Sequence, residues 1–280
     1  MIEYWIARFA VASVARFPAL ARLYIRLLDL AIPRLRRTAV RNLAIAKISD
    51  HDIISGMYRS LARALVAFSK LPSITRENVG EWIRYDGLDN FKAAQQRGRG
   101  VLVATAHFGN WELSAFAHAL MTAPMHIVVR PLDNPRVDAL VEERRALSGN
   151  RIITKKDAAR EILRALKCGD AVGILIDQNT ALDEGVFIDF FGAKACAGVA
   201  FARLAHHSGA AVVPGYALWS EKEQRYILRF DPEIEMSGDA QQDTQRIHTH
   251  LENVIRQNPD QYLWIHRRWK TRPPSEASIY

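Results

Sequence analysis

The 280-residue sequence predicts an α/β protein with a mostly parallel or mixed central sheet flanked by helices, with an N-terminal helical segment facing a membrane. Short apolar runs alternate with helical patterns from residue 101 onward, which is typical of βαβ units. A hydrophobic share of 49% with 24% charged residues is typical of a globular core. No repeat, low-complexity tract or linker is apparent. We therefore expect one structural domain overall, in which the helical segment 1–70 packs on an α/β domain over 71–273, followed by a loose tail over 274–280.

The N-terminal segment predicts two short helices before Pro33, then helices over 36–46 and 50–68. Residues 1–50 hold nine Arg and Lys against three acids, which is +6 of the net charge of +8. The longest uncharged run, 9–15, is far shorter than the roughly 20 apolar residues that span a bilayer. Arg and large apolar residues in a helical rhythm favour an interfacial helix on anionic lipid over ordinary helices with a solvated Arg face. No nucleic-acid-binding module is apparent, so we expect no nucleic-acid partner.

The rest of the chain predicts alternating elements, with boundaries set by Gly, Pro and polar clusters. The expected strands are 100–106, 125–130, 151–154, 171–177, 186–191, 211–219 and 224–230. The expected helices are 111–121, 135–147, 157–168, 197–208 and 240–257.

The run from His107 to Glu112 follows an apolar strand pattern, and it is the strongest candidate for chemistry. A His at the carboxyl end of a strand can act as a general base, and a carboxylate can fix its tautomer. Gly109 permits a tight turn, and Asn110 is a good N-cap for the helix that follows. A purely structural His at a strand end is the alternative interpretation, and the residue types alone leave both open.

The sequence shows no protein nucleophile near this His. It has no Gly-x-Ser-x-Gly turn, and Cys168 and Cys196 lie far from His107 along the chain. The two cysteines form no disulfide framework and fit a reducing cytoplasm. His206, His207, His248 and His250 lack Cys or carboxylate partners at metal spacing, so we expect no metal site. Direct attack by a substrate hydroxyl is favoured over an acyl-enzyme.

Further polar residues follow other predicted strands. Arg130 would bind phosphate or an oxyanion if it is not simply a surface residue in an ion pair. Asp177 and Gln178 end an apolar strand and would lie at the same rim as His107. Phe190 and Phe191 would line an acyl groove or belong to the core.

Taken together, these segments resemble the bacterial lipid A biosynthesis acyltransferases, the lauroyl and myristoyl "late" enzymes of the wider lysophospholipid acyltransferase group. The similarity runs from about residue 37 to 273 and rests on several motifs in order. They are Arg41-Asn42-Leu43, His107-Phe108-Gly109-Asn110-Trp111-Glu112-Leu113, Arg130-Pro131-Leu132-Asp133-Asn134-Pro135, Asp177-Gln178-Asn179, Phe190-Phe191-Gly192 and Gln261 through Pro273.

The resemblance implies transfer of a fatty acyl chain from acyl carrier protein or acyl-CoA to a glycolipid hydroxyl, with no other cofactor. His107 would be the general base and Glu112 its partner. Arg130, Asn110, Gly109, Asp177 and Gln178 would bind substrate or the oxyanion. The family implies a location at the cytoplasmic face of the bacterial inner membrane. Many members have an apolar N-terminal anchor, but the charged N-terminal segment of this chain favours peripheral or monotopic attachment.

The chain departs from the family pattern in three places. First, the chain has Asp177-Gln178-Asn179 where the family would have Asp-Gln-Asp or a similar acidic trio. Second, Ala195-Cys196-Ala197-Gly198 stands where small hydroxylated residues are often found after the Phe-Phe-Gly turn. Third, the N-terminal segment is more charged than in many members. Three alternatives stay open: acylation of another glycolipid such as a phosphatidylinositol mannoside, thioester hydrolysis, and a non-catalytic membrane-binding relative.

Overall fold

The structure of the protein is a computed structural model that describes residues 1–49, 52–154 and 158–280. Its helices are α1 (Ile2–Arg16), α2 (Leu20–Ala31), α3 (Pro33–Ile45), α4 (Asp52–Lys70), α5 (Val79–Trp82), α6 (Leu88–Gln96), α7 (Trp111–Met121), α8 (Pro135–Ala146), α9 (Ala158–Lys167), α10 (Ala200–Ser208) and α11 (Ala240–Gln257), with short 3₁₀ turns over Leu71–Ser73 and Pro259–Gln261. Its strands are β1 (Ile83–Asp86), β2 (Val101–Thr105), β3 (His126–Val129), β4 (Arg151–Thr154), β5 (Ala171–Leu175), β6 (Gly185–Phe190), β7 (Ala193–Gly198), β8 (Ala211–Ser220) and β9 (Arg225–Phe230).

Seven of these strands form one mixed sheet in the order β1-β9-β8-β2-β5-β3-β4. Neighbouring strands pair in parallel except for β8 and β9, which form an antiparallel pair. In the centre of the sheet, Thr105 of β2 lies opposite Leu175 of β5. The carboxyl ends of these two strands are therefore level, and the segments that follow them meet at one rim. The predicted α/β fold with a mixed central sheet is confirmed.

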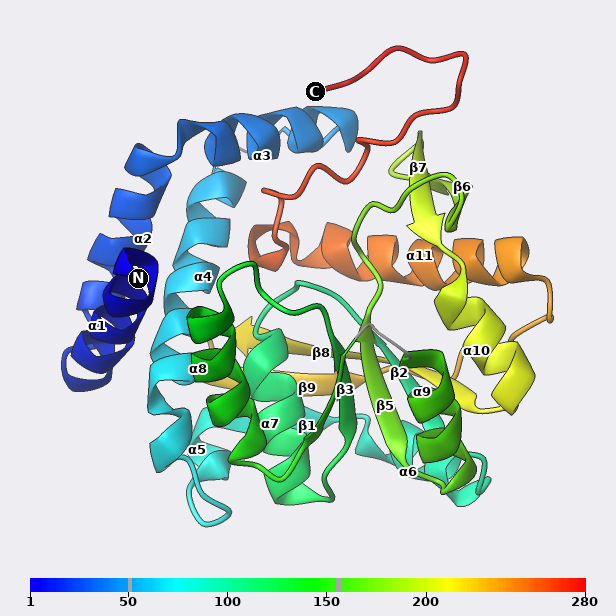
Figure 1. Ribbon diagram of the computed structural model, residues 1–280, viewed down its shortest axis with the longest axis horizontal. Helices are drawn as coiled ribbons and strands as arrows, with labels where there is room; N and C mark the ends of the chain where they lie inside the picture. The colour runs from blue at the N-terminus through cyan, green and yellow to red at the C-terminus, as the bar shows by residue number, and fades with distance from the viewer. Residues whose placement is uncertain (50–51, 155–157) are drawn as a thin grey trace.

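Helices cover both faces of the sheet, as Figure 1 shows. On one face, α5, α6 and α7 pack against alternate residues of the central strands, among them Val101 and Val103. On the other face, α9, α10 and α11 cover the intervening residues, such as Leu102 and Ala104. The central strands are buried on both faces, as expected for parallel pairing. A third apolar cluster joins α3, α4, the β6–β7 hairpin and the C-terminal segment above the carboxyl ends of the strands.

The N-terminal helices α1 and α2 lie at the edge of the molecule against α4 (Figure 1). They leave many large apolar side chains exposed to solvent: Ile2, Trp5, Ile6, Phe9, Phe17, Leu23, Leu27, Leu28 and Leu30. In the described ranges, no helix has both the length and the apolar character needed to cross a bilayer.

The structure differs from the sequence predictions in three segments. Residues 79–96, where no element was expected, form α5, β1 and α6, and β1 is an edge strand that reaches the sheet through β9. Residues 193–198 were partly assigned to a helix, but they pair with β6 in a separate hairpin. The tail was expected to be loose, and residues 274–278 are exposed, but its end is anchored: the Tyr280 hydroxyl donates to Asn42 and accepts from the Trp269 amide.

Candidate active site

A tight turn between β2 and α7 places His107 at the rim of the sheet. The Gly109 N–H donates to the Gln261 carbonyl at 2.9 Å, and the Asn110 N–H donates to the Ala217 carbonyl at 2.9 Å. Gly109 has a φ of +60°, and a Cβ at this position would collide with the Ala217 carbonyl oxygen. Only glycine fits both conditions. Asn110 caps α7, its side-chain oxygen accepting from the Leu113 N–H at 3.0 Å.

The partner of His107 is Asp177, two residues beyond β5. Nδ1 of His107 lies 3.0 Å from one carboxylate oxygen of Asp177, and the His107 backbone N–H donates to the other oxygen at 3.2 Å. The Asp177 side chain is 4% exposed and that of His107 19%. A buried carboxylate that accepts from Nδ1–H holds the ring in one tautomer and leaves Nε2 free to take a proton.

The charges of the pair stabilise each other. Burial lowers the pKa of His107, but the Asp177 charge and hydrogen bond raise it, and the net direction is upward. Burial raises the pKa of the Asp177 carboxyl, whereas His107 and the hydrogen bonds lower it below its ordinary value. Asp177 is therefore ionised at neutral pH, and its charge can stabilise an imidazolium at His107.

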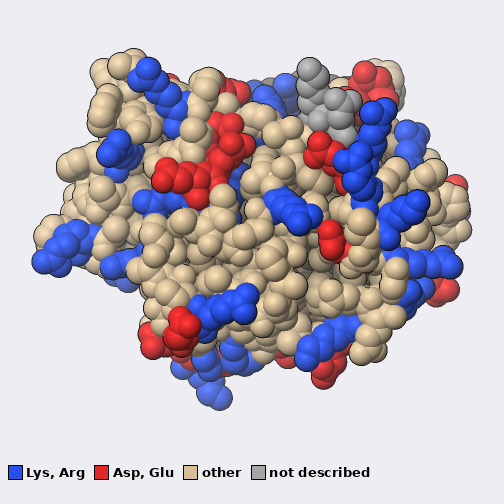
Figure 2. All heavy atoms as spheres, turned by 60° about the horizontal axis from the view of Figure 1, so that its bottom comes forward, with Lys and Arg blue, Asp and Glu red and all other residues tan. Residues whose placement is uncertain are grey.

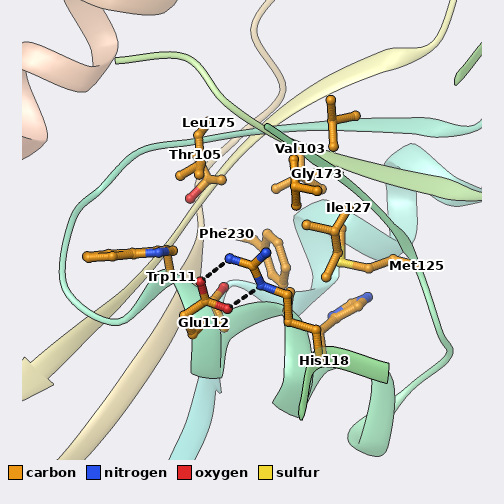
Figure 3. A pocket seen from close by; sticks show the side chains of 15 residues that line it. Val103, Thr105, Trp111, Glu112, His118, Met125, Ile127, Gly173, Leu175 and Phe230 are labelled. Atoms are coloured by element: carbon orange, nitrogen blue, oxygen red, sulfur yellow. Dashed lines mark hydrogen bonds and ion pairs between the residues drawn. The ribbon is translucent and has the colours of Figure 1, made fainter. Parts of the chain in front are cut away.

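The prediction that Glu112 is the hydrogen-bond partner of His107 is wrong, because Asp177 occupies that place. The Glu112 carboxylate instead receives two hydrogen bonds from Arg145 of α8, at 2.8 and 2.5 Å, and Figure 3 shows this ion pair. Glu112 is the second residue of α7 and lies beside Val103 and Ile127 on the α7 face of the sheet, whereas His107 precedes the helix at the rim. The charge of Glu112 still contributes to the raised pKa of His107.

His107 faces an open groove of about 1180 Å³. Its apolar lining comes from β3, β5, α9 and α10 and includes Val128, Ile174, Ile162 and Leu204. Trp111 also lines the groove, and its ring packs edge-to-face with the imidazole of His107, with 5.1 Å between the ring centroids.

The groove also carries positive charge. Three arginines, Arg130, Arg145 and Arg203, line it together with two acids, Asp133 and Glu184. The Arg130 side chain is 78% exposed and lies 3.7 Å from Asp133. The groove therefore joins a candidate base to an apolar surface and to cations that suit an anionic group.

The structure brings part of the predicted set together and separates the rest. His107, Arg130 and Gln178 all line the groove, and Asp177 lies directly behind His107. Gly109 and Asn110 were expected to bind substrate, but they are buried in the turn and shape it instead.

Phe190 and Phe191 were expected either to line an acyl groove or to belong to the core, and the structure places both in the core. Phe190 is 0% and Phe191 2% exposed. Both rings pack on Trp269, and Phe191 also contacts Trp264. They belong to the core because the β6–β7 hairpin folds over the C-terminal segment. Neither ring lines the open groove, whose apolar walls come from β3, β5, α9 and α10.

The sequence analysis did not identify two hydrogen-bond partners in this region, one of Glu112 and one of Asn179. Arg145 was not singled out, because an Arg in the last turn of a helix is common at a surface. His266 accepts a hydrogen bond from the Asn179 N–H at 2.9 Å, and burial lowers the pKa of His266 to about 4. Asn179 and its side-chain contact with Thr271 thus tie the Asp177 segment to the C-terminal segment. An amide suits this role, because it donates to the Thr271 hydroxyl at 3.0 Å and accepts from the Thr271 N–H at 3.0 Å.

Comparisons with known proteins agree with this arrangement. The Escherichia coli (strain K12) lipid A biosynthesis palmitoleoyltransferase is 31% identical over 294 aligned residues, covering 99% of this chain and 95% of that protein. The lauroyltransferase and the myristoyltransferase of lipid A biosynthesis from the same organism are 28% and 24% identical, each over 99% of this chain and over 95% and 91% of the relative. A family model described as bacterial lipid A biosynthesis acyltransferase matches residues 4–271. The chain is therefore a member of the bacterial lipid A biosynthesis acyltransferase family.

Proposed function

We propose that this O-acyltransferase moves a fatty acyl chain from a thioester of acyl carrier protein or coenzyme A to a hydroxyl of a lipid A precursor. One observation carries the proposal: a His107 ring held by a buried carboxylate faces a groove that is both apolar and basic. The apolar walls suit an acyl chain. Both proposed donors carry phosphate on their pantetheine arm, and the Arg side chains on the wall suit such a group.

In the proposed reaction, Nε2 of His107 takes the proton of the acceptor hydroxyl as its oxygen attacks the thioester carbonyl carbon. The carbon–sulfur bond then breaks, and the imidazolium returns the proton to the leaving thiolate. Asp177 holds the tautomer and balances the imidazolium charge, in the way that a buried Asp does in hydrolase triads. Arg130 is proposed to bind phosphate or to stabilise the oxyanion, because it extends into the same groove.

The groove lining supports direct transfer. Among the described residues that line the groove, none is Ser or Cys. Cys196 is a buried residue of β7. Burial raises the pKa of its thiol, which disfavours a thiolate nucleophile. We therefore propose that no covalent acyl-enzyme forms and that no cofactor beyond the donor is required.

The exposed apolar surface of α1 and α2 supports peripheral attachment to the cytoplasmic face of the bacterial inner membrane. Trp5 and Phe9 are 56% and 67% exposed, and Arg8 and Arg16 lie on the same helix. Aromatic side chains beside Arg suit the boundary of an anionic lipid layer. Figure 2 shows Lys and Arg scattered over the molecule together with Asp and Glu, so positive charge is not confined to these helices.

The experiment that tests this proposal supplies radiolabelled acyl chains on acyl carrier protein and on coenzyme A, with a Kdo-bearing lipid A precursor as acceptor. We expect a more highly acylated lipid from the wild-type protein and none from His107→Ala, with equal melting temperatures. If neither donor gives a product, we would conclude that the acceptor is another glycolipid. His107-dependent release of free fatty acid alone would identify a thioester hydrolase, and no turnover of any kind would identify a non-catalytic relative.

A further inference from the structure

Two neighbouring helices beside the groove carry a row of exposed cations. α9 and α10 pack against each other, and each supplies part of the groove lining. Arg160, Arg164 and Lys167 of α9 are exposed, and their spacing of four and three residues places them on one face of the helix. Arg203 of α10 is exposed as well and lines the groove itself. We call these four residues the basic ridge.

The positive charge of the basic ridge is not balanced locally. The sequences of α9 and α10 hold these four cations and one acid, Glu161. Among the residues that the structure describes, none of the four cations has an ion-pair partner. The nearby helix α8, by contrast, balances three Arg with three acids. Arg160 and Arg164 lie four residues apart on one helix, where like charges are destabilising. α9 therefore keeps an uncompensated charge at a cost to its own stability, as expected of a surface that attracts an anionic partner.

The basic ridge differs in character from the surface of α1 and α2. In Figure 1, α1 and α2 lie at the left edge of the molecule, whereas α9 and α10 lie on the right. Most of the large exposed apolar side chains in the described part of the chain belong to α1 and α2, and none belongs to α9 or α10. A helix that binds at a membrane interface needs an apolar face that enters the lipid. The basic ridge offers no such face, so it suits an anionic partner that is dissolved in water.

We propose that the basic ridge is the docking surface for an acidic acyl carrier protein that brings the thioester to the groove. The inference rests on the proposed function. Arg160 and Lys167 are seven residues apart, which is about 10 Å along the helix axis. A row of this length fits the acidic surface of a protein better than it fits the compact phosphate groups of coenzyme A. Arg203 belongs both to the ridge and to the groove lining, so the pantetheine arm of a docked carrier would begin at the edge of the groove that holds His107.

The test compares the same acyl chain on acyl carrier protein and on coenzyme A at low ionic strength. The double variant Arg160→Glu with Arg164→Glu reverses the charge of the ridge and leaves the groove lining intact. We expect kcat/KM with the carrier protein to fall about 10-fold or more, because complementary charge raises association rates by about 10- to 10³-fold. With coenzyme A, kcat/KM should change little. Lys92→Glu is the matched control, since Lys92 is an exposed cation of α6 on the opposite face of the sheet, and it should behave as wild type with both donors.

A second measurement separates docking from catalysis. Calorimetry records binding of the holo carrier protein, without an acyl chain, to the full-length protein at low and at high salt. Binding that weakens with salt and is lost in the double variant supports the ridge, even if the wild type transfers no acyl chain and the proposed function fails. Unchanged carrier binding in the double variant, or an equal loss of kcat/KM with both donors, overturns the docking surface and leaves the proposed function intact. If the double variant instead loses only co-sedimentation with anionic vesicles, the ridge is a lipid surface and the proposal is overturned.

Discussion

The substitution Asp177→Asn isolates the role of the carboxylate behind His107. It keeps the size of the side chain and removes its charge. In the native site, the two carboxylate oxygens accept from Nδ1–H and from the backbone N–H of His107, at 3.0 and 3.2 Å. An Asn has one oxygen and one NH₂ group, so it can satisfy only one of these donors. If its oxygen accepts from the backbone N–H, its NH₂ faces Nδ1 and forces the ring proton onto Nε2.

The expected cost follows from this geometry. A ring with its proton on Nε2 cannot act as the base, so the general-base contribution of about 10²- to 10⁴-fold is lost. At the upper limit this corresponds to about 5.4 kcal/mol of transition-state stabilisation. The pKa of His107 also falls, because the charge that raises it is gone. Since the base works only when it is neutral, kcat/KM falls as pH decreases through this pKa, and the acid limb of the variant moves to lower pH.

The assay is kcat/KM for acyl transfer from pH 5 to 9 with wild type, Asp177→Asn and Glu112→Gln, with folding checked by circular dichroism. Glu112→Gln is the matched carboxylate control, since Glu112 pairs with Arg145 and does not touch the imidazole. We expect a much smaller rate loss and a smaller pH shift in the control. A near-normal rate and an unmoved acid limb in Asp177→Asn, with collapse in Glu112→Gln, would refute the His107–Asp177 assignment.

Three further predictions follow from the same contacts. Glu112→Ala leaves the Arg145 guanidinium, whose side chain is 17% exposed, without its counter-charge, so urea unfolding should show a loss of about 3 kcal/mol. A loss below about 0.5 kcal/mol would mean that solvent screens the pair, as at an exposed site. Gly109→Ala should lower the free energy of unfolding by at least about 1–3 kcal/mol, because the position has positive φ and no room for a Cβ; an unchanged melting temperature contradicts this. Trp5→Glu with Phe9→Glu should abolish co-sedimentation with anionic vesicles without changing turnover of soluble donors, and undiminished sedimentation would place the membrane surface elsewhere.

The sequence predicted the sheet class and the position of His107 because both depend on local signals. Apolar strands alternating with helices indicate an α/β sheet, and a Gly-Asn pair before a helical run indicates a turn with an N-cap. The hairpin over 185–198 was harder, because Ala, Cys and Gly in its second strand favour neither state locally. Its pairing with β6 decides the conformation. The elements over 79–96 were missed because each is too short to show a long periodic pattern.

The partner of His107 could not be predicted from spacing. Glu112 is five residues away along the chain, whereas Asp177 is seventy residues away. Asp177 becomes the neighbour because β2 and β5 lie side by side with their carboxyl ends level, and strand order is a tertiary property. The available signal was an Asp at the last position of a strand predicted to be buried. A site at the sheet rim was predictable, but the pairing within it was not.

The most direct test of the central claim is a rapid-quench single-turnover experiment with labelled donor, lipid A precursor and full-length protein in excess. Three fractions are counted at each time: acylated lipid, free fatty acid and protein-bound label. The account predicts that label passes from donor to lipid with none bound covalently to protein, and that His107→Ala stops this passage while the fold persists. Protein-bound label that forms and then decays into product, or normal transfer by His107→Ala, would contradict direct base-catalysed transfer.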